Sequence, residues 1–166
     1  FEFAPSVSSP LTGTTRHLVT YTRRNLASQT DIGAVLVEGT SVVASTNLTT
    51  LETGPTPGVD QSFSSVDSDG ERFLVTYSER VPAFGYDDVY AAELFVENNT
   101  LRVMQGHEFV YNISLSCLHN QVASRPGPSA QSRAHLTVYD ILQNSSDRDV
   151  GASFFTGVNV GDAQPF

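Results

Sequence analysis

The acidic stretch Asp67-Ser68-Asp69-Gly70-Glu71 has the residue types and spacing that best fit a chemical role. Hard cations such as Ca²⁺ need several oxygen ligands close together, and carboxylates one residue apart can supply them. Asp67, Asp69 and Glu71 are therefore a calcium candidate, although the full EF-hand pattern is absent. The alternative is a hairpin turn, because Asp-Gly is a leading turn dipeptide. The sequence favours the turn.

A second set of polar residues recurs three times along the chain. Each of three tyrosines is followed ten or eleven residues later by an aspartate. Recurrence in every unit indicates a structural role, because an active site needs its groups only once. We expect the aspartates to bond loop backbone amides and the tyrosines to pack with a polar tip. The pairs are Tyr21 and Asp31, Tyr77 and Asp88, and Tyr139 and Asp149.

The other charged candidates do not assemble into a catalytic set. His17 and His135 share a repeat position that Phe73 fills in the middle unit, which is typical of packing. Arg23-Arg24 and Asp87-Asp88 are crowded charges that an ordinary solvated surface explains. There is no Gly-rich phosphate loop, and no Ser-His-Asp set can be assembled. The sequence predicts no catalytic residue and no cofactor apart from the calcium candidate.

The single cysteine and the sequons bear on the cellular setting. Cys117 lies in an apolar-alternating segment and has no partner for an internal disulfide, so we expect a small buried side chain. Asn-x-Ser/Thr sequons make Asn47, Asn98 and Asn144 glycosylation candidates. Low charge and abundant Ser and Thr are typical of a secreted protein.

The elements that position these residues are three related strand pairs. The segments 16–21 (RHLVTY), 72–77 (RFLVTY) and 134–139 (AHLTVY) are each followed by a loop and an Asp-x-x-Ala strand. Both faces of the first strand of each pair are substantially apolar, which predicts a sheet covered on both sides. No segment has helical periodicity. Stacked four-stranded units of this length are typical of propeller blades.

Further anchors divide the chain into units. Ser6–Ser9 precedes Ser62–Ser65 by 56 positions, the same offset that separates Tyr21 from Tyr77. Glu2-Phe3 matches Glu108-Phe109, and the Pro-, Gly- and Ser-rich segment 119–132 is expected to be an exposed loop inserted into the third unit. The expected units are 5–50, 60–104 and 109–160, within a single all-β domain covering 1–166.

The stretch RFLVTY, a loop and then Asp88-Val89-Tyr90-Ala91-Ala92 resembles the blade repeat of secreted bacterial β-propeller proteins. This resemblance implies four-stranded antiparallel blades, an extracellular location and a binding or scaffolding role. It transfers no catalytic residue. The acidic stretch, starting at Ser65, also resembles a sialidase Asp-box, but its Gly falls one place late. The expected fold is all-β with three propeller-like units, and a β-sandwich is the alternative.

Composition excludes some partners. The net charge of −9 argues against nucleic acid, because binding phosphates needs clustered Lys and Arg. No apolar run approaches the roughly 18 residues that a membrane span needs. The chain begins at Phe1 without Met, from which we expect processing or excision from a longer product.

Three blades do not close a propeller, which typically needs about four to eight. We therefore expect self-association or the remainder of a larger chain. The segment Phe1-Glu2-Phe3-Ala4 looks like a spare strand that pairs with a sheet edge near 156–166, in the same chain or in the next copy. A structural, self-assembling role ranks first. A glycan- or protein-binding module with Phe84, Tyr86 and Tyr90 on a loop rim ranks second, and a sialidase-like hydrolase third.

Overall fold

The structure is a computed structural model that describes residues 2–24, 29–51, 59–111, 115–129, 132–144, 146–156 and 164–165. Among these residues, none belongs to a helix that is long and apolar enough to cross a membrane. Strands make up nearly all of the described chain, with one short 3-10 helix, η1 (Leu48–Thr50).

The strands form three antiparallel sheets, each a meander of four strands in chain order. The first sheet contains β1 (Glu2–Val7), β2 (Arg16–Arg24), β3 (Thr30–Glu38) and β4 (Ser41–Asn47). The second contains β5 (Gln61–Ser68), β6 (Phe73–Val81), β7 (Tyr86–Glu97) and β8 (Thr100–Tyr111). The third contains β9 (Ser116–Arg125), β10 (Ala134–Asn144), β11 (Asp147–Thr156) and the two-residue β12 (Gln164–Pro165).

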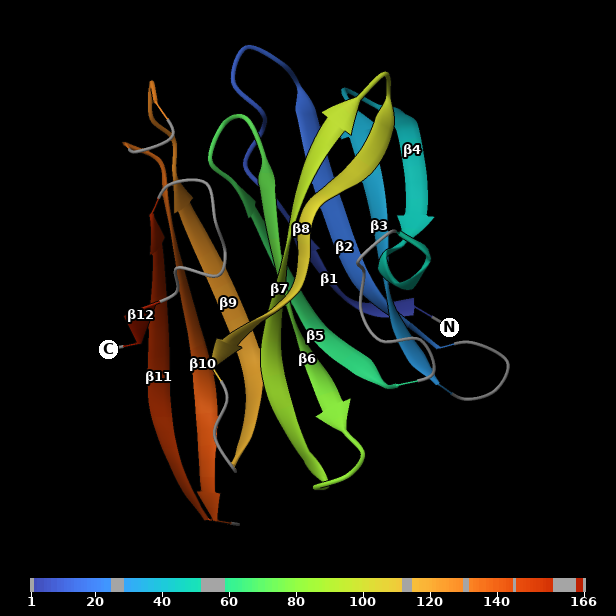
Figure 1. Ribbon diagram of the computed structural model, residues 1–166. Helices are drawn as coiled ribbons and strands as arrows, with labels where there is room; N and C mark the ends of the chain where they lie inside the picture. Colours follow the sequence, from blue (N-terminus) through green and yellow to red (C-terminus); the bar gives the residue numbers. More distant parts are fainter. Residues whose placement is uncertain are drawn as a thin grey trace.

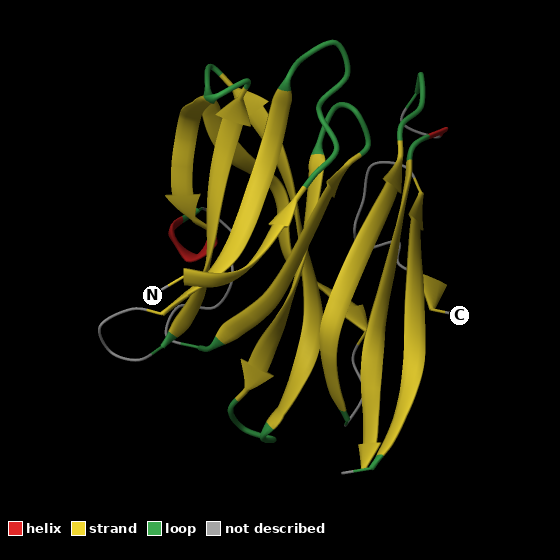
Figure 2. Ribbon diagram, turned by 180° about the vertical axis from the view of Figure 1, so that it is seen from behind, coloured by secondary structure: helices red, strands yellow, loops and turns green. Residues whose placement is uncertain are grey.

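The three sheets stand side by side with their faces packed together, the second sheet between the other two (Figures 1 and 2). The first strand of each sheet, β1, β5 or β9, lies against the first strand of the next sheet. The expected all-β fold of three four-stranded antiparallel units is confirmed. The two-sheet sandwich is not what the described residues form.

The repeat is visible in the strand register. In each sheet the repeat tyrosine lies opposite the third residue of the Asp-x-x-Ala segment on the neighbouring strand. The aspartate of that segment lies opposite the second residue after the tyrosine. The cross-strand pairs are Tyr21 with Gly33, Tyr77 with Tyr90, and Tyr139 with Gly151. The three tyrosines therefore occupy equivalent sites, as the sequence predicts.

Alternation along the strands gives the second sheet two apolar faces, and each contributes to one of two cores. The core between the first and second sheets includes Leu18, Ile32 and Leu36 on one side and Phe73, Val75, Tyr77 and Leu94 on the other. The core between the second and third sheets joins Leu74, Val89 and Ala91 to Cys117, Tyr139, Ile141 and Phe155. Cys117 is buried, as expected, and burial followed by the charge of Asp88 raises the pKa of its thiol to about 12.

The boundary between the second and third units differs from the prediction. Glu108 and Phe109 lie in β8, the last strand of the second sheet, and not at the start of the third unit. The first strand of the third sheet is β9, which runs through the first half of the segment expected to be an exposed loop. The equivalence of Ser6 with Ser62 is also wrong. Ser6 pairs with Thr20 and Ser65 pairs with Thr76, so Ser65 is the structural counterpart of Ser6.

The segment expected to be a spare strand is not spare. Glu2 and Phe3 pair with Arg23 and Thr22, so Glu2–Ala4 is the beginning of β1 in the first sheet. Within this chain the described part of the segment therefore belongs to the first sheet, and its pairing with the edge of a second copy stays a prediction. The described neighbour of β11 at that edge is β12. Phe1 lies outside the described residues.

In two of the sheets a glycine lies beneath an aromatic ring. A Cβ atom added to Gly33 would lie 2.5 Å from the Tyr21 ring, and one added to Gly151 would lie 2.4 Å from the Tyr139 ring. In the second sheet the same position holds Tyr90, whose ring stacks on Tyr77 with centroids 6.1 Å apart. The tyrosine ring thus fills the volume that a side chain would otherwise take.

We predict that Gly151→Ala lowers the free energy of unfolding by about 1 to 3 kcal/mol, because the new methyl group overpacks the site. In the background of Tyr139→Leu, the same substitution should cost much less. A double-mutant cycle measured by urea denaturation checks this coupling. Additive effects of the two substitutions would contradict the proposed ring contact.

Candidate functional site

The first strands of the three sheets, β1, β5 and β9, lie against one another and are called the inner strands here. All three carry the same irregularity. The pairing of each inner strand with the next strand shifts register at one point, between Phe3 and Ser6 in β1, between Ser62 and Ser65 in β5, and opposite the step from Val138 to Asp140 in β9. The first residue inside each bulge has a positive φ although none is glycine: Ala4 (50°), Phe63 (53°) and His119 (51°). Such bulges bend a strand and re-aim its side chains.

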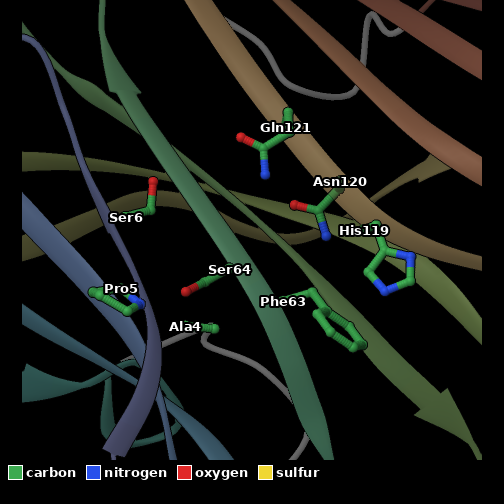
Figure 3. Close-up of a pocket in the computed structure, with 8 residues that line it drawn as sticks. All are labelled: Ala4, Pro5, Ser6, Phe63, Ser64, His119, Asn120 and Gln121. Atoms are coloured by element: carbon green, nitrogen blue, oxygen red, sulfur yellow. The ribbon is translucent and has the colours of Figure 1, made fainter.

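The three bulges face one another and line a shared cavity of about 190 Å³. Each inner strand contributes adjacent residues to its wall, as Figure 3 shows. The lining residues are Ala4, Pro5 and Ser6 from β1, Phe63 and Ser64 from β5, and His119, Asn120 and Gln121 from β9. None was predicted to line a binding site, because no local signal in the sequence marks a left-handed Ala, Phe or His.

The polar side chains that line the cavity differ in their hydrogen bonding. The Ser64 hydroxyl is buried and has no hydrogen-bond partner, and in Figure 3 it points toward β1. Asn120 is fully buried; its Oδ1 accepts from the Thr76 hydroxyl (2.6 Å) and its Nδ2 donates to Ser78 Oγ (3.3 Å). These bonds fix the amide of Asn120 at the wall.

The outer wall of the cavity is an aromatic pair. The Phe63 and His119 rings meet edge to face, with centroids 4.5 Å apart. His119 Nδ1 lies 3.0 Å from Asp140 Oδ2, which also accepts from Arg148 at 2.8 Å. The hydrogen bond from His119, followed by the contact with Arg148, lowers the pKa of Asp140. Asp140, which does not line the cavity, therefore fixes the His119 ring from the side away from the cavity.

Asp67 joins the three sheets. It lies in β5, where Oδ1 accepts from the Ser9 amide (2.9 Å) beyond β1, and Oδ2 accepts from the Ser124 amide (2.7 Å) in β9. A carboxylate that accepts from two backbone amides makes stronger bonds than a neutral group would. Both oxygens that were candidates for a calcium ion thus have amide partners from neighbouring sheets.

We predict that Asp67→Asn lowers the free energy of unfolding by about 1.5 to 3 kcal/mol, because the new NH₂ group would face an amide N–H. Chemical denaturation followed by circular dichroism measures the loss. Asp147→Asn, at an exposed position, is the matched control and should change stability little. Equal effects of the two substitutions would rule out the joining role.

The rest of the acidic stretch forms the hairpin turn that the sequence favoured. Asp69 Oδ1 accepts from the amides of Glu71 (2.9 Å) and Arg72 (2.8 Å), and Gly70 has φ 97°. The buried guanidinium of Arg133 contacts Asp69 Oδ2 (Nε, 3.3 Å) and Glu71. Asp67, Asp69 and Glu71 therefore do not converge on one point. No group of three potential metal ligands occurs in the described part of the chain.

In the described part of the chain, two of the recurring aspartates accept from side-chain amides. Asp31 accepts from Asn47 Nδ2 at 3.2 Å, and Asp149 accepts from Gln143 Nε2 at 2.8 Å. Asp88 is buried, and its Oδ1 has no hydrogen-bond partner. Burial, followed by the charge of neighbouring Asp87, raises the pKa of Asp88 from 3.8 to about 6. The shared position is thus occupied by a solvated carboxylate in one sheet and a desolvated one in another.

The raised pKa of Asp88 predicts a pH dependence of stability. Between about pH 4 and 6 the folded protein holds a proton that the unfolded chain has released, so this contribution to stability falls as pH rises through that window. Asp88→Asn should raise the free energy of unfolding near pH 7 by roughly 2 to 3 kcal/mol, and less near pH 4. Denaturation curves across pH measure this difference. Asp149→Asn, the exposed equivalent, should show no such dependence, and parallel curves for the two variants would contradict the assignment.

The other predicted positions are spread over the molecule. The glycosylation candidates Asn98 and Asn144 lie at exposed hairpin ends, whereas Asn47 caps η1 and is half-buried, so its amide is engaged. Of the expected aromatic rim, Phe84 and Tyr86 stack with centroids 5.5 Å apart. Tyr90 is buried in the core and does not belong to the rim.

The position of the histidines matches the packing interpretation. His17 Nδ1 lies 2.8 Å from the Ser8 carbonyl, and His135 Nδ1 lies 2.6 Å from Ser124 Oγ. Burial lowers the pKa of His135, although the charges of Asp69 and Asp67 oppose this effect. Both rings therefore bond to neighbouring inner-strand segments.

Comparisons with known proteins add no argument about the fold or the site. No family model matches the sequence, and no curated protein matches it. One similar solved structure, a complex of BT0996 with RGII, has a TM-score of 0.48 and 13% sequence identity over 93% of the present protein. The match spans about half (52%) of the length of BT0996 in that structure. A likeness at this level supports no inference about ligand or activity.

Proposed function

We propose that this chain is a non-catalytic structural module that associates with a second copy of itself. The contacts would be the outer faces of the first and third sheets, which no other sheet in the described part of the chain covers and which are called the open faces. The observation that carries the proposal is on the third sheet. Leu136 and Val150 are 39% and 78% exposed there. Their counterparts in the other sheets are all 0% exposed: Leu18 and Leu74 for Leu136, and Ile32 and Val89 for Val150.

The first sheet has the complementary open face. Val7, Val19 and Val35 lie side by side across β1, β2 and β3, and Val7 is 63% exposed. The same row in the second sheet is buried against the first sheet; it consists of Val66, Val75 and Ala92. The open face of the first sheet is thus the type of surface that packs against a neighbouring sheet inside this molecule.

The two open faces match each other by repeat position. The open face of the third sheet carries Leu136, whose counterpart in the first sheet is Leu18. The open face of the first sheet carries Val19, whose counterpart in the second sheet is Val75. Inside the chain, the Leu18 face of the first sheet packs against the Val75 face of the second sheet. A second copy can therefore continue the stack from head to tail. Burial contributes about 1.5 to 3 kcal/mol for each aliphatic side chain that is fully covered, against an association cost of about 4 to 15 kcal/mol.

The geometry of such association follows from symmetry. Two copies joined at both faces make a ring of six sheets, within the range of about four to eight blades in closed propellers. Contacts that do not close on themselves make an open array. This association through faces replaces the strand addition expected from the sequence.

A secreted, non-catalytic setting is part of the proposal. It is supported by the low charge content of 16% and by exposed sequons at Asn98 and Asn144. The crowded charges considered for catalysis are engaged locally instead. Arg23 lies 4.0 Å from Asp31 in the first sheet, and Arg80 lies 3.0 Å from Asp87 in the second.

Analytical ultracentrifugation over a concentration series tests the proposal. The wild-type chain should sediment as a reversible dimer or larger species. Val150→Asp should weaken association at least tenfold, because an unpaired carboxylate would be buried in the contact. Val19→Asp should have the same effect from the other face.

Met104→Asp is the matched control. Met104 is an exposed apolar residue on β8 that belongs to neither open face. The substitution Met104→Asp should leave sedimentation unchanged. A wild-type chain that stays monomeric at the highest concentration, or equal effects of all three substitutions, would overturn the proposal.

A further inference from the structure

We infer that the cavity between the three bulges binds one neutral, hydroxyl-rich ring, that is, a single saccharide residue. The inference rests on the shape, polarity and charge of the cavity and is independent of self-association. The lining comes from the inner strands, while the open faces belong to the outer sides of the first and third sheets.

The size of the cavity limits the ligand. Its volume of about 190 Å³ is far above the roughly 10 to 15 Å³ that one water needs. It is below the roughly 300 to 1,000 Å³ of pockets for drug-sized molecules. A single sugar ring fits between these limits, whereas a peptide helix or a nucleotide does not.

The hydrogen-bonding groups of the wall suit hydroxyls. The Ser64 hydroxyl is buried without a partner, and a buried polar group of this kind calls for a ligand or a water. Asn120 has one N–H and one lone pair left after its bonds to Thr76 and Ser78. Gln121 is exposed and its amide reaches toward the cavity in Figure 3. Hydroxyls both donate and accept, so they suit the Ser64 hydroxyl and the exposed Gln121 amide, while Asn120 is fully buried and keeps its bonds within the wall.

The charge of the wall excludes ionic ligands. None of the eight lining residues is Asp, Glu, Arg or Lys. His119 is the one titratable residue among them, and its ring is already paired with Asp140 outside the cavity. Phe63 adds an aromatic surface, which suits the apolar C–H side of a sugar ring.

Differences between equivalent positions indicate a site and not merely a repeated structural device. The bulges recur in every sheet, but their side chains do not. The second bulge position holds Pro5, Ser64 or Asn120, and the residue after it holds Ser6, Ser65 or Gln121. The backbone is therefore repeated, while the side chains of the wall differ from one sheet to the next.

Saturation-transfer NMR and chemical-shift titration test the inference on the intact chain. The probes are glucose, galactose, mannose and xylose, their methyl glycosides, and the charged sugars glucuronate and glucosamine. At least one neutral sugar should bind, and the charged ones should bind more weakly. Equal binding of a methyl glycoside identifies a residue within a glycan as the ligand, and loss of binding identifies a free sugar; both outcomes support the inference.

Two substitutions locate the site. Ser64→Ala and Gln121→Ala should each weaken binding about threefold to tenfold, the value of one hydrogen bond. Ser64→Ala should leave thermal stability unchanged or higher, because the hydroxyl has no partner in the free protein. Gln143→Ala, at an exposed amide on β10, is the matched control and should bind normally. Absence of binding for every neutral sugar, preference for a charged sugar, or binding that neither substitution weakens would overturn the inference.

Discussion

The three inner strands meet edge to edge without pairing as strands, and the whole arrangement depends on how their free backbone amides are satisfied. An edge strand leaves a row of unpaired N–H groups, and burial makes each of them costly. Here side chains of the adjacent sheet accept from them. Ser6 Oγ accepts from the Val66 amide (3.2 Å), and its counterpart Ser65 Oγ accepts from the Val122 amide (3.1 Å). Together with Asp67, these bonds set the spacing at which the cores and the bulge cavity form.

Most of the sheet architecture could be predicted from the sequence. The second and third strands of each sheet carry recurring anchors, and the period-two alternation of a strand converts such anchors directly into register. The inner strands could not be aligned in the same way. Each of them contains a bulge that displaces the pairing with the next strand, so the match of Ser6 to Ser62 was misleading. The strand β8 extends past Glu108 and Phe109 to Tyr111, and this hid the start of the third sheet.

The candidate site was much less accessible to sequence reasoning than the turn beside it. Asp-Gly predicted the hairpin at Asp69 because both residues act locally. The cavity depends on left-handed Ala4, Phe63 and His119, a conformation that sequence patterns associate with Gly or Asn. The role of Asp67 depends on amides more than fifty residues away in either direction. Contacts of that range leave no trace in local spacing.

The glycine beneath a tyrosine ring in the outer two sheets has a consequence for how such repeats diverge. In the first and third sheets this volume is filled by a tyrosine ring above a glycine, and in the second sheet by the stacked rings of Tyr77 and Tyr90. A change of one partner alone leads either to a collision or to a void. The two solutions are therefore separated by less stable intermediates, and each unit tends to keep the pair that it inherited.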